Sequence, residues 1–304
     1  DFSPGRPRFT DITDSAAPEL ASVGLVTSGL WSDVNQDGAI DLLIATEWGS
    51  IRFFRNANGQ FINESNASKI AERTGWWNSL SAADIDNDGD IDYVAMNVGL
   101  NTKYGKASAK KPAALYYGDM DGTGKPHLVE AKPGNADSLP IRGLSCSATA
   151  MPLLGKKFPT FRAFASADLV DIYTPKRLNE AHNFEANTFE SGILINESLD
   201  GNTQFRWQPL PALAQSTPGY GVATVDSNGD GNSDIFSVGN LYSREPETGL
   251  WRGAPGVFLA GTGTGAFTFQ MPNTTGLLAP NDTKSLSVTD LDSNGRPDYI
   301  AVEN

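Results

Sequence analysis

The sequence predicts an all-β protein, a β-propeller made of four-stranded antiparallel blades with a small helical insertion. Three observations predict this fold: a nine-residue acidic loop that occurs five times, strand-like segments on both sides of each loop, and a second kind of hairpin that recurs between the loops. One acidic hairpin and one turn hairpin together supply four antiparallel strands, which is one propeller blade.

The repeated loop carries oxygen-bearing side chains at positions 1, 3, 5 and 9 and glycine at position 6. Because Ca²⁺ takes about six to eight oxygen ligands, four such side chains and a backbone carbonyl suit it well. A fifth copy, at 119–127, offers Asp119, Asp121 and Thr123 but has His127 at position 9, so we expect weak or no binding there. The candidate metal ligands of the four intact copies are Asp33, Asn35, Asp37, Asp41, Asp84, Asp86, Asp88, Asp92, Asp226, Asn228, Asp230, Asp234, Asp290, Asp292, Asn294 and Asp298.

Two alternatives to a calcium loop fit the sequence less well. A turn rich in Asp, Asn and Gly needs no metal, but repulsion among clustered carboxylates disfavours an empty loop, and the shared register of five copies favours calcium. An EF-hand needs an acid at position 12 and flanking helices. Position 12 of the four intact loops is instead Ile44, Ala95, Ser237 and Ala301. We therefore expect about four calcium ions and a doubtful fifth.

Strands are expected on both sides of every acidic loop. Alternating stretches precede the loops, and short apolar runs such as Ile40–Ala45 and Ile91–Met96 follow them. The second kind of hairpin combines a strand, an Asn/Gly turn and an aromatic residue that opens the return strand. Its three copies are Ile51–Phe61, Gly192–Phe205 and Gly256–Phe267.

The spacing of the loops predicts five blades begun in this chain, as part of a seven-bladed propeller or a smaller ring. Asp33 and Asp84 are 51 residues apart and Asp226 and Asp290 are 64 apart, whereas 142 residues separate Asp84 from Asp226. We interpret the long interval as two blades, one without its metal loop. On this interpretation the hairpin at Asp119 is the outer hairpin of the second blade.

The segment 134–190 departs from the β pattern. Apolar residues have helical spacing over Phe161–Tyr173, and a second short helix is expected within Pro175–Ala186. We predict a single domain over 1–304 with a helical insertion at 134–190. The start at Asp1 suggests a processed product, and the end at Asn304 suggests either truncation at the C-terminus or a five-bladed ring closed by Phe9–Thr13.

Composition narrows the function classes. A net charge of −13 leaves no basic stripe for nucleic acid, and no apolar run is long enough for a membrane helix. The single cysteine, Cys146, excludes an intrachain disulfide, and two histidines are few for zinc or acid–base chemistry. Calcium loops fit a calcium-rich setting, so we expect a secreted, periplasmic or cell-surface protein.

The four intact loops resemble the FG-GAP/VCBS repeats of integrin α-subunit propellers. Further segments resemble bacterial relatives of cartilage acidic protein, the ASPIC/UnbV-type proteins: Phe9–Thr13, Arg142–Ser147, Lys157–Phe161, Asp168–Tyr173 and Glu185–Gly192. The resemblance implies a secreted or surface-attached, calcium-stabilised propeller that serves adhesion, recognition or scaffolding. Its partner would be a protein or polysaccharide at the cell surface, and the chain could be a subunit of a larger assembly.

Two other functions remain open from the sequence. A calcium-assisted polysaccharide lyase or hydrolase would need a base, for which Lys103, Tyr104, His127 and His182 are candidates, although nothing in the sequence groups them. A lectin could use tryptophans as sugar platforms, but packing between blades explains them more simply. The six tryptophans are Trp31, Trp48, Trp76, Trp77, Trp207 and Trp251.

Overall fold

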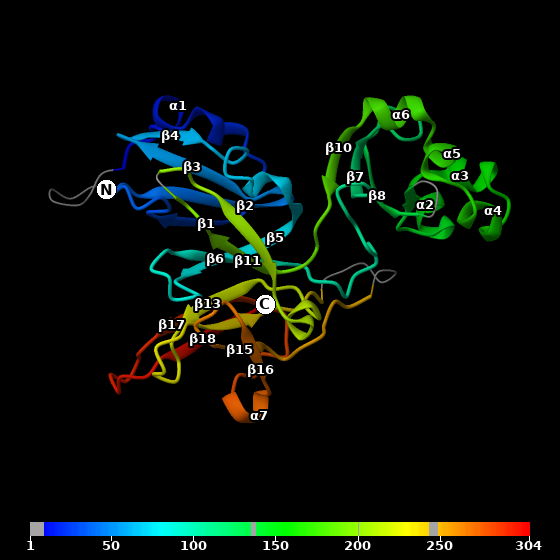
Figure 1. The fold of residues 1–304 in the computed structure, drawn as a ribbon. Helices are drawn as coiled ribbons and strands as arrows, with labels where there is room; N and C mark the ends of the chain where they lie inside the picture. The colour runs from blue at the N-terminus through cyan, green and yellow to red at the C-terminus, as the bar shows by residue number, and fades with distance from the viewer. Residues whose placement is uncertain (1–8, 135–137, 200, 243–248) are drawn as a thin grey trace, which may run out of the picture.

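The computed structural model describes residues 9–134, 138–199, 201–242 and 249–304. Antiparallel sheets dominate it, and they stack beside one another in a propeller-like arrangement, with a separate module to one side (Figure 1). The prediction of an all-β, propeller-like fold is therefore confirmed for the arrangement of the sheets.

Three four-stranded units follow the predicted blade pattern of inner hairpin and outer hairpin. The first contains β1 (Leu25–Ser32), β2 (Asp41–Ser50), β3 (Arg52–Ala57) and β4 (Gln60–Asn63). The second contains β5 (Thr74–Ala83), β6 (Asp92–Asn97), β11 (Gly192–Asn196) and β12 (Phe205–Pro209). The third contains β13 (Gly221–Val225), β14 (Asp234–Val238), β15 (Val257–Gly261) and β16 (Phe267–Gln270), and a last hairpin pairs β17 (Thr283–Thr289) with β18 (Asp298–Glu303).

Short hydroxyl side chains let the inner strands of neighbouring units approach closely. Thr27 Oγ1 on β1 donates to the Trp77 carbonyl on β5 at 2.8 Å. On the other side of β5, the Ser81 and Thr224 hydroxyls lie 2.8 Å apart, which connects β5 to β13. The far end of β2 also pairs with the start of β5, so the first two units form one continuous sheet.

The apolar cores lie between adjacent units. Phe53, Trp77 and Tyr93 are fully buried between the first and second units, and Ile193 and Leu259 are fully buried between the second and third. Burying one such side chain stabilises the fold by about 1.5–3 kcal/mol. Strands β2, β6, β11 and β14 are buried along nearly their whole length, which explains their apolar runs.

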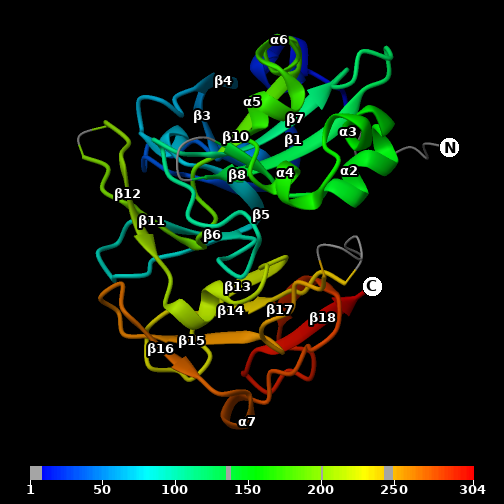
Figure 2. The same cartoon turned by 90° about the vertical axis from the view of Figure 1, so that its right-hand side faces the viewer.

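The second unit is interrupted by an insertion that forms its own module. Between β6 and β11 the chain forms a four-stranded sheet in the order β10-β7-β8-β9. Its strands are β7 (Ala113–Gly118), β8 (His127–Pro133), β9 (Ser138–Pro140) and β10 (His182–Ala186). Five helices cover it and share a core with it: α2 (Leu144–Ala150), α3 (Pro152–Lys157), α4 (Phe161–Ala165), α5 (Leu169–Tyr173) and α6 (Pro175–Glu180). Figure 1 shows these helices to the right of the stacked sheets, and Figure 2, in which that side faces the viewer, shows them grouped around β7 and β8.

This arrangement corrects the prediction about Asp119. The hairpin β7–β8 belongs to the inserted sheet, and β11–β12 is the outer hairpin of the second unit. The long interval from Asp84 to Asp226 therefore holds an insertion rather than an extra blade. Three four-stranded units and one hairpin are described, so the predicted count of five blades is not confirmed.

The structure also differs from the sequence-based expectations for one helix and for the N-terminal segment. The helical spacing over Phe161–Tyr173 splits into α4 and α5, because the chain turns at Ser166 and a new helix begins after Asp168. Phe9–Thr13 pairs with no strand of the described structure; the short helix α1 (Thr13–Ala16) begins there, and Phe9 is 94% exposed.

The remaining described helices are single turns at the edges of the sheets. They are the 3₁₀ segments η1 (Pro18–Ser22), η2 (Ile70–Glu72) and η3 (Ala212–Gln215), and the α-helix α7 (Pro272–Thr275). Among the helices of the described residues, none is long and apolar enough to cross a membrane.

Candidate metal centres

All five acidic loops join antiparallel strands, as predicted, and they share one backbone conformation. The carboxylate at position 1 accepts the N–H of the glycine at position 6; the distances for Gly38, Gly89 and Gly295 are 2.9, 3.1 and 2.8 Å. The same glycines have φ of 85°, 97° and 80°, a left-handed conformation that costs a side chain energy. Glycine at position 6 is thus required by the turn itself.

The side chains at positions 3 and 5 wrap around the same turn. The position-5 oxygen accepts the N–H of position 7, at 2.8 Å in Asp37, 2.9 Å in Asp88 and 2.8 Å in Asn294. One oxygen of each side chain is therefore fixed by the backbone. The side chains at positions 1 and 5 therefore lie on one turn, whereas the predicted ligand at position 9 is the first residue of the following strand.

Two loops bring three carboxylates close enough to share one ion. One ligand oxygen from each of Asp84, Asp86 and Asp88 lies within 4.8 Å of the other two, and the same is true of Asp290, Asp292 and Asp298. In the first group, Asp84 Oδ1 and Asp86 Oδ1 are buried without a hydrogen-bond partner in the described structure. Buried anionic oxygens are costly unless a cation or donor matches them, so the residues present fit a hard divalent ion.

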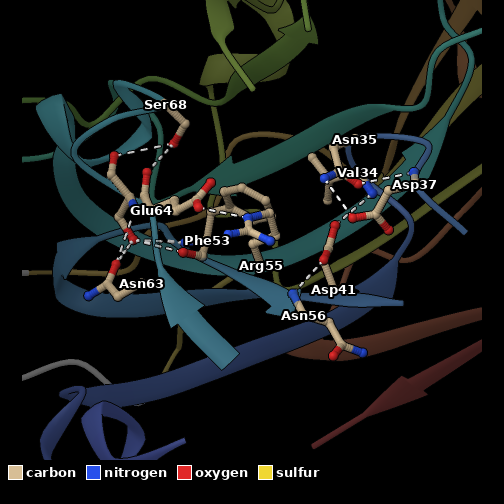
Figure 3. A network of polar contacts seen from close by, with 11 residues as sticks. Val34, Asn35, Asp37, Asp41, Phe53, Arg55, Asn56, Asn63, Glu64 and Ser68 are labelled. Atoms are coloured by element: carbon tan, nitrogen blue, oxygen red, sulfur yellow. Dashed lines mark hydrogen bonds and ion pairs between the residues drawn. The ribbon is translucent and has the colours of Figure 1, made fainter. Parts of the chain in front are cut away.

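The aspartate at position 9 has a second role that the sequence analysis missed. Asp41 is fully buried, and its two oxygens accept the N–H groups of Val34 at 3.0 Å and Asn56 at 2.7 Å (Figure 3). Val34 lies in the loop, whereas Asn56 lies on β3. The carboxylate therefore fastens the inner hairpin to the third strand of the same unit.

The other units repeat this contact. Asp92 joins Ile85 to Asn196 of β11, and Asp234 joins Ser227 to Gly261 of β15. Asp298, whose hairpin has no third strand in the described structure, accepts from the Leu291 N–H at 2.9 Å. The signal was present in the sequence: position 9 is followed at once by a short apolar run, and a carboxylate buried with such a strand must find partners within the sheet.

Burial changes the acidity of these carboxyls. Burial is the largest cause that raises the pKa of Asp92 to about 6, and the charges of Asp86 and Asp88 raise it further. The pKa of Asp41 and that of Asp86 are also raised, again chiefly by burial. A cation placed in the loop would oppose all of these shifts, because it favours the charged form.

We expect calcium binding to release protons near pH 6. The pKa of Asp92 lies above the usual range, so part of the carboxyl is protonated there, and a nearby Ca²⁺ displaces that proton. Calorimetric titrations in two buffers of different ionisation enthalpy measure the release. It should fade by pH 8, where Asp92 is already ionised; identical heats in both buffers at pH 6 would count against a metal at this loop.

Neighbouring loops also contact one another. Gln36 of the first loop donates to the Asp90 side chain and, at 3.3 Å, to the Gly89 carbonyl of the second loop. Asn87 of the second loop donates to Asn232 of the fourth at 3.0 Å. Three loops therefore lie side by side along one edge of the stacked sheets.

The loop at 119–127 has the same turn but lacks a position-9 carboxylate that accepts from two strands. Asp119 still accepts the Gly124 N–H at 2.9 Å, and the Thr123 hydroxyl donates to Asp121 at 2.7 Å. His127 Nε2 lies 3.5 Å from Asp121 and cannot replace a carboxylate that accepts from two strands. Weak or no metal binding at this loop remains a prediction.

The candidate bases have different surroundings. Tyr104 is buried among aromatic rings, and its hydroxyl donates to Glu130 of β8. His127 lies at the tip of the inserted sheet, Lys103 is exposed on a loop, and His182 is exposed on β10. The Tyr104 ring also contacts Trp48 of β2, with centroids 5.3 Å apart, and this contact connects the insertion to the stacked sheets.

Most of the tryptophans pack inside the protein. Trp77 is fully buried, and Trp48 and Trp251 are 7% and 4% exposed. The adjacent Trp76 and Trp77 contribute to different clusters on the two faces of β5. Trp31 alone among the six is mostly exposed, at 61%, and its ring contacts Phe61.

Comparison with known proteins supports the repeat assignment. Residues 33–95 match the model of the FG-GAP-like repeat, a span that runs from the first acidic loop into β6. No curated protein matches the chain. The structure is similar to that of the exotype rhamnogalacturonan lyase YesX, with a TM-score of 0.28 and 13% identity over 92% of this chain and 39% of that one. The chain thus spans well under half the length of that enzyme.

Proposed function

We propose that this protein is a calcium-binding β-propeller module that acts outside the cytosol as a non-enzymatic adhesion, recognition or scaffold domain. The observation that carries the proposal is the shared geometry of the four intact loops. Each presents oxygen side chains around one turn, and two of them gather three carboxylates within 4.8 Å. The FG-GAP-like match over 33–95 supports the same proposal, because such repeats commonly bind calcium.

In this proposal Asp33, Asp84, Asp226 and Asp290, with their partners at positions 3, 5 and 9, hold one Ca²⁺ per loop. The ions supply positive charge where the chain concentrates its own negative charge. The loops lie at hairpin tips, and the carboxylates of Asp41, Asp92 and Asp234 reach the third strand of their units, so the ions would make these hairpins and units more rigid. A rigid surface suits binding to a protein or polysaccharide, and the resemblance to ASPIC/UnbV-type proteins favours a surface-attached or secreted setting.

Incubation with acidic polysaccharides in the presence of calcium separates binding from catalysis. We expect retention on an immobilised polysaccharide or surface protein without a change in polymer length. Unsaturated products detected by ultraviolet absorbance, or new reducing ends, would overturn the non-enzymatic part of the proposal in favour of a lyase or hydrolase.

The variant Asp121→Asn should leave the number of bound calcium ions unchanged. The loop at 119–127 has His127 at position 9 and a threonine at position 5, so it offers few hard ligands. The matched variant Asp86→Asn, at the same loop position in the second unit, should remove about one ion. Equal losses from the two variants, measured by equilibrium dialysis, would show that the inserted loop is also a calcium site.

A further inference from the structure

We propose that a cavity between the second unit and the insertion binds a short acidic saccharide, a polyhydroxylated ligand that carries a carboxylate. The cavity has a volume of about 820 Å³, which falls in the range of sites for small organic ligands. Its walls come from three segments: the residues before β5, the loop 100–109 and the connection 187–190. Residues of the insertion and of the stacked units therefore line the cavity together.

The cavity is distinct from the metal loops and does not depend on them. Arg73 immediately precedes β5, whereas Asp84 immediately follows it. A ten-residue strand places the two ends roughly 30 Å apart. A ligand in the cavity is thus out of direct contact with an ion in the second loop.

Arg73 is the group that favours a carboxylate. Its guanidinium lies over the ring of Trp207, 5.1 Å from the centroid, and Nη1 is 3.5 Å from Thr188 Oγ1. In the described part of the chain Arg73 forms no ion pair. Burial lowers the pKa of its guanidinium, whereas the negative charges of Glu190 and Glu72 raise it. A planar guanidinium that is held by an aromatic ring and lacks a carboxylate partner suits a bidentate contact with a ligand carboxylate.

The other charged groups favour a sugar over a simple anion. Lys106 adds a second cation at the rim, but Glu72 and Glu190 also line the cavity, so the four side chains carry no net charge. A phosphate or sulfate would gain little binding energy here, because the two glutamates repel it as the two cations attract it. A sugar acid uses both signs, because its hydroxyl groups donate to the glutamates while its carboxylate pairs with Arg73.

The apolar part of the wall is rigid. Phe189 lines the cavity, and its ring stacks on Tyr104 with centroids 4.8 Å apart and planes 13° apart. Asn187 fixes the same segment by donating to the Glu72 carbonyl at 2.9 Å and accepting from the Thr74 N–H at 3.1 Å. A preorganised wall lowers the entropic cost of binding.

The insertion also carries much of the basic charge of the chain. Residues 98–191 hold 12 of the 23 lysines and arginines but only nine of the 36 acids. Four of these lysines lie within 103–111, the loop that borders the cavity. The four intact acidic loops therefore lie in the stacked units, whereas the cavity borders the basic insertion, which attracts an acidic ligand to this face.

Isothermal titration calorimetry with a trimer of galacturonic acid tests the proposal, in the presence of saturating calcium and with the neutral trimer of galactose as the comparison ligand. We expect saturable binding of the acidic trimer only. Arg73→Gln should weaken it by about 10- to 100-fold, and Lys106→Gln, a change on the exposed loop, should weaken it less. Arg206→Gln is the matched control, because exposed Arg206 lies on β12 and pairs with Glu197 outside the cavity.

Several outcomes would overturn the inference. They are an absence of saturable binding, equal binding of the neutral trimer, equal losses in Arg73→Gln and Arg206→Gln, or competition by inorganic phosphate at matched concentration. A trimer held by a loop calcium ion would bind Arg73→Gln as tightly as the unchanged protein, which also contradicts it. The inference goes beyond the proposed function: a protein that binds calcium but no trimer refutes the cavity alone.

Discussion

Replacing Asp92 by alanine is expected to destabilise the protein by about 3 kcal/mol, even without calcium. Asp92 is fully buried, and its carboxylate accepts the N–H groups of Ile85 at 3.0 Å and Asn196 at 2.8 Å. Alanine leaves both donors unmatched and removes the side-chain contact between the acidic loop and β11. Relief of the buried charge, which is reflected in the raised pKa of Asp92, offsets part of this loss.

Asp298→Ala is the matched control within the same chain. It removes the carboxylate from the same loop position, but the described structure shows one backbone donor, Leu291, on this side chain. We expect a loss of about 1 kcal/mol. Denaturant unfolding of both variants in chelator measures the difference, and equal losses would show that the contact with the third strand contributes nothing.

Chelation of calcium should have the largest effect on stability. A ligand that binds only the native state stabilises it by about 2.7 kcal/mol per site when its concentration is a hundred times the dissociation constant. Four intact loops could together contribute on the order of 10 kcal/mol, which corresponds to a fall in the melting temperature of roughly 10 °C or more. Restored calcium should reverse the change.

The comparison needs two controls. Magnesium at the same concentration should restore little of the lost stability, because it prefers a small octahedral site with several waters. The double variant Asp84→Asn with Asp86→Asn should lose part of its response to calcium, because these side chains belong to one carboxylate group. An identical melting curve with and without chelator would remove the basis for calcium-stabilised loops.

The sequence predicted the repeated parts of the fold well, for a physical reason. In each intact acidic hairpin, glycine at position 6 is needed for a positive φ, and the oxygen side chains at positions 1 and 5 are needed to bind backbone N–H groups. The loop therefore depends on local chemistry, which a single chain displays. The turn hairpins β3–β4, β11–β12 and β15–β16 were found on the same basis.

The placement of the Asp119 hairpin could not be read from local chemistry. Whether β7–β8 joins the second unit or a separate sheet depends on which strand pairs with β6, and the chain returns to pair with it only at Gly192. His127 at position 9 did indicate the difference. Asp41 and Asp92 accept an N–H group from the third strand of their units, and a hairpin without a carboxylate at position 9 cannot make this contact. Likewise, Arg73, Lys106 and Glu190 are far apart in sequence, and only the folded insertion brings them to one cavity.

The number of calcium ions bound per chain tests the central claim most directly. After exhaustive chelation and return to calcium buffer, equilibrium dialysis with elemental analysis should find about four ions per chain, one for each loop with an intact set of ligands at positions 1, 3, 5 and 9. A protein that is folded by circular dichroism yet retains less than one ion would contradict the account.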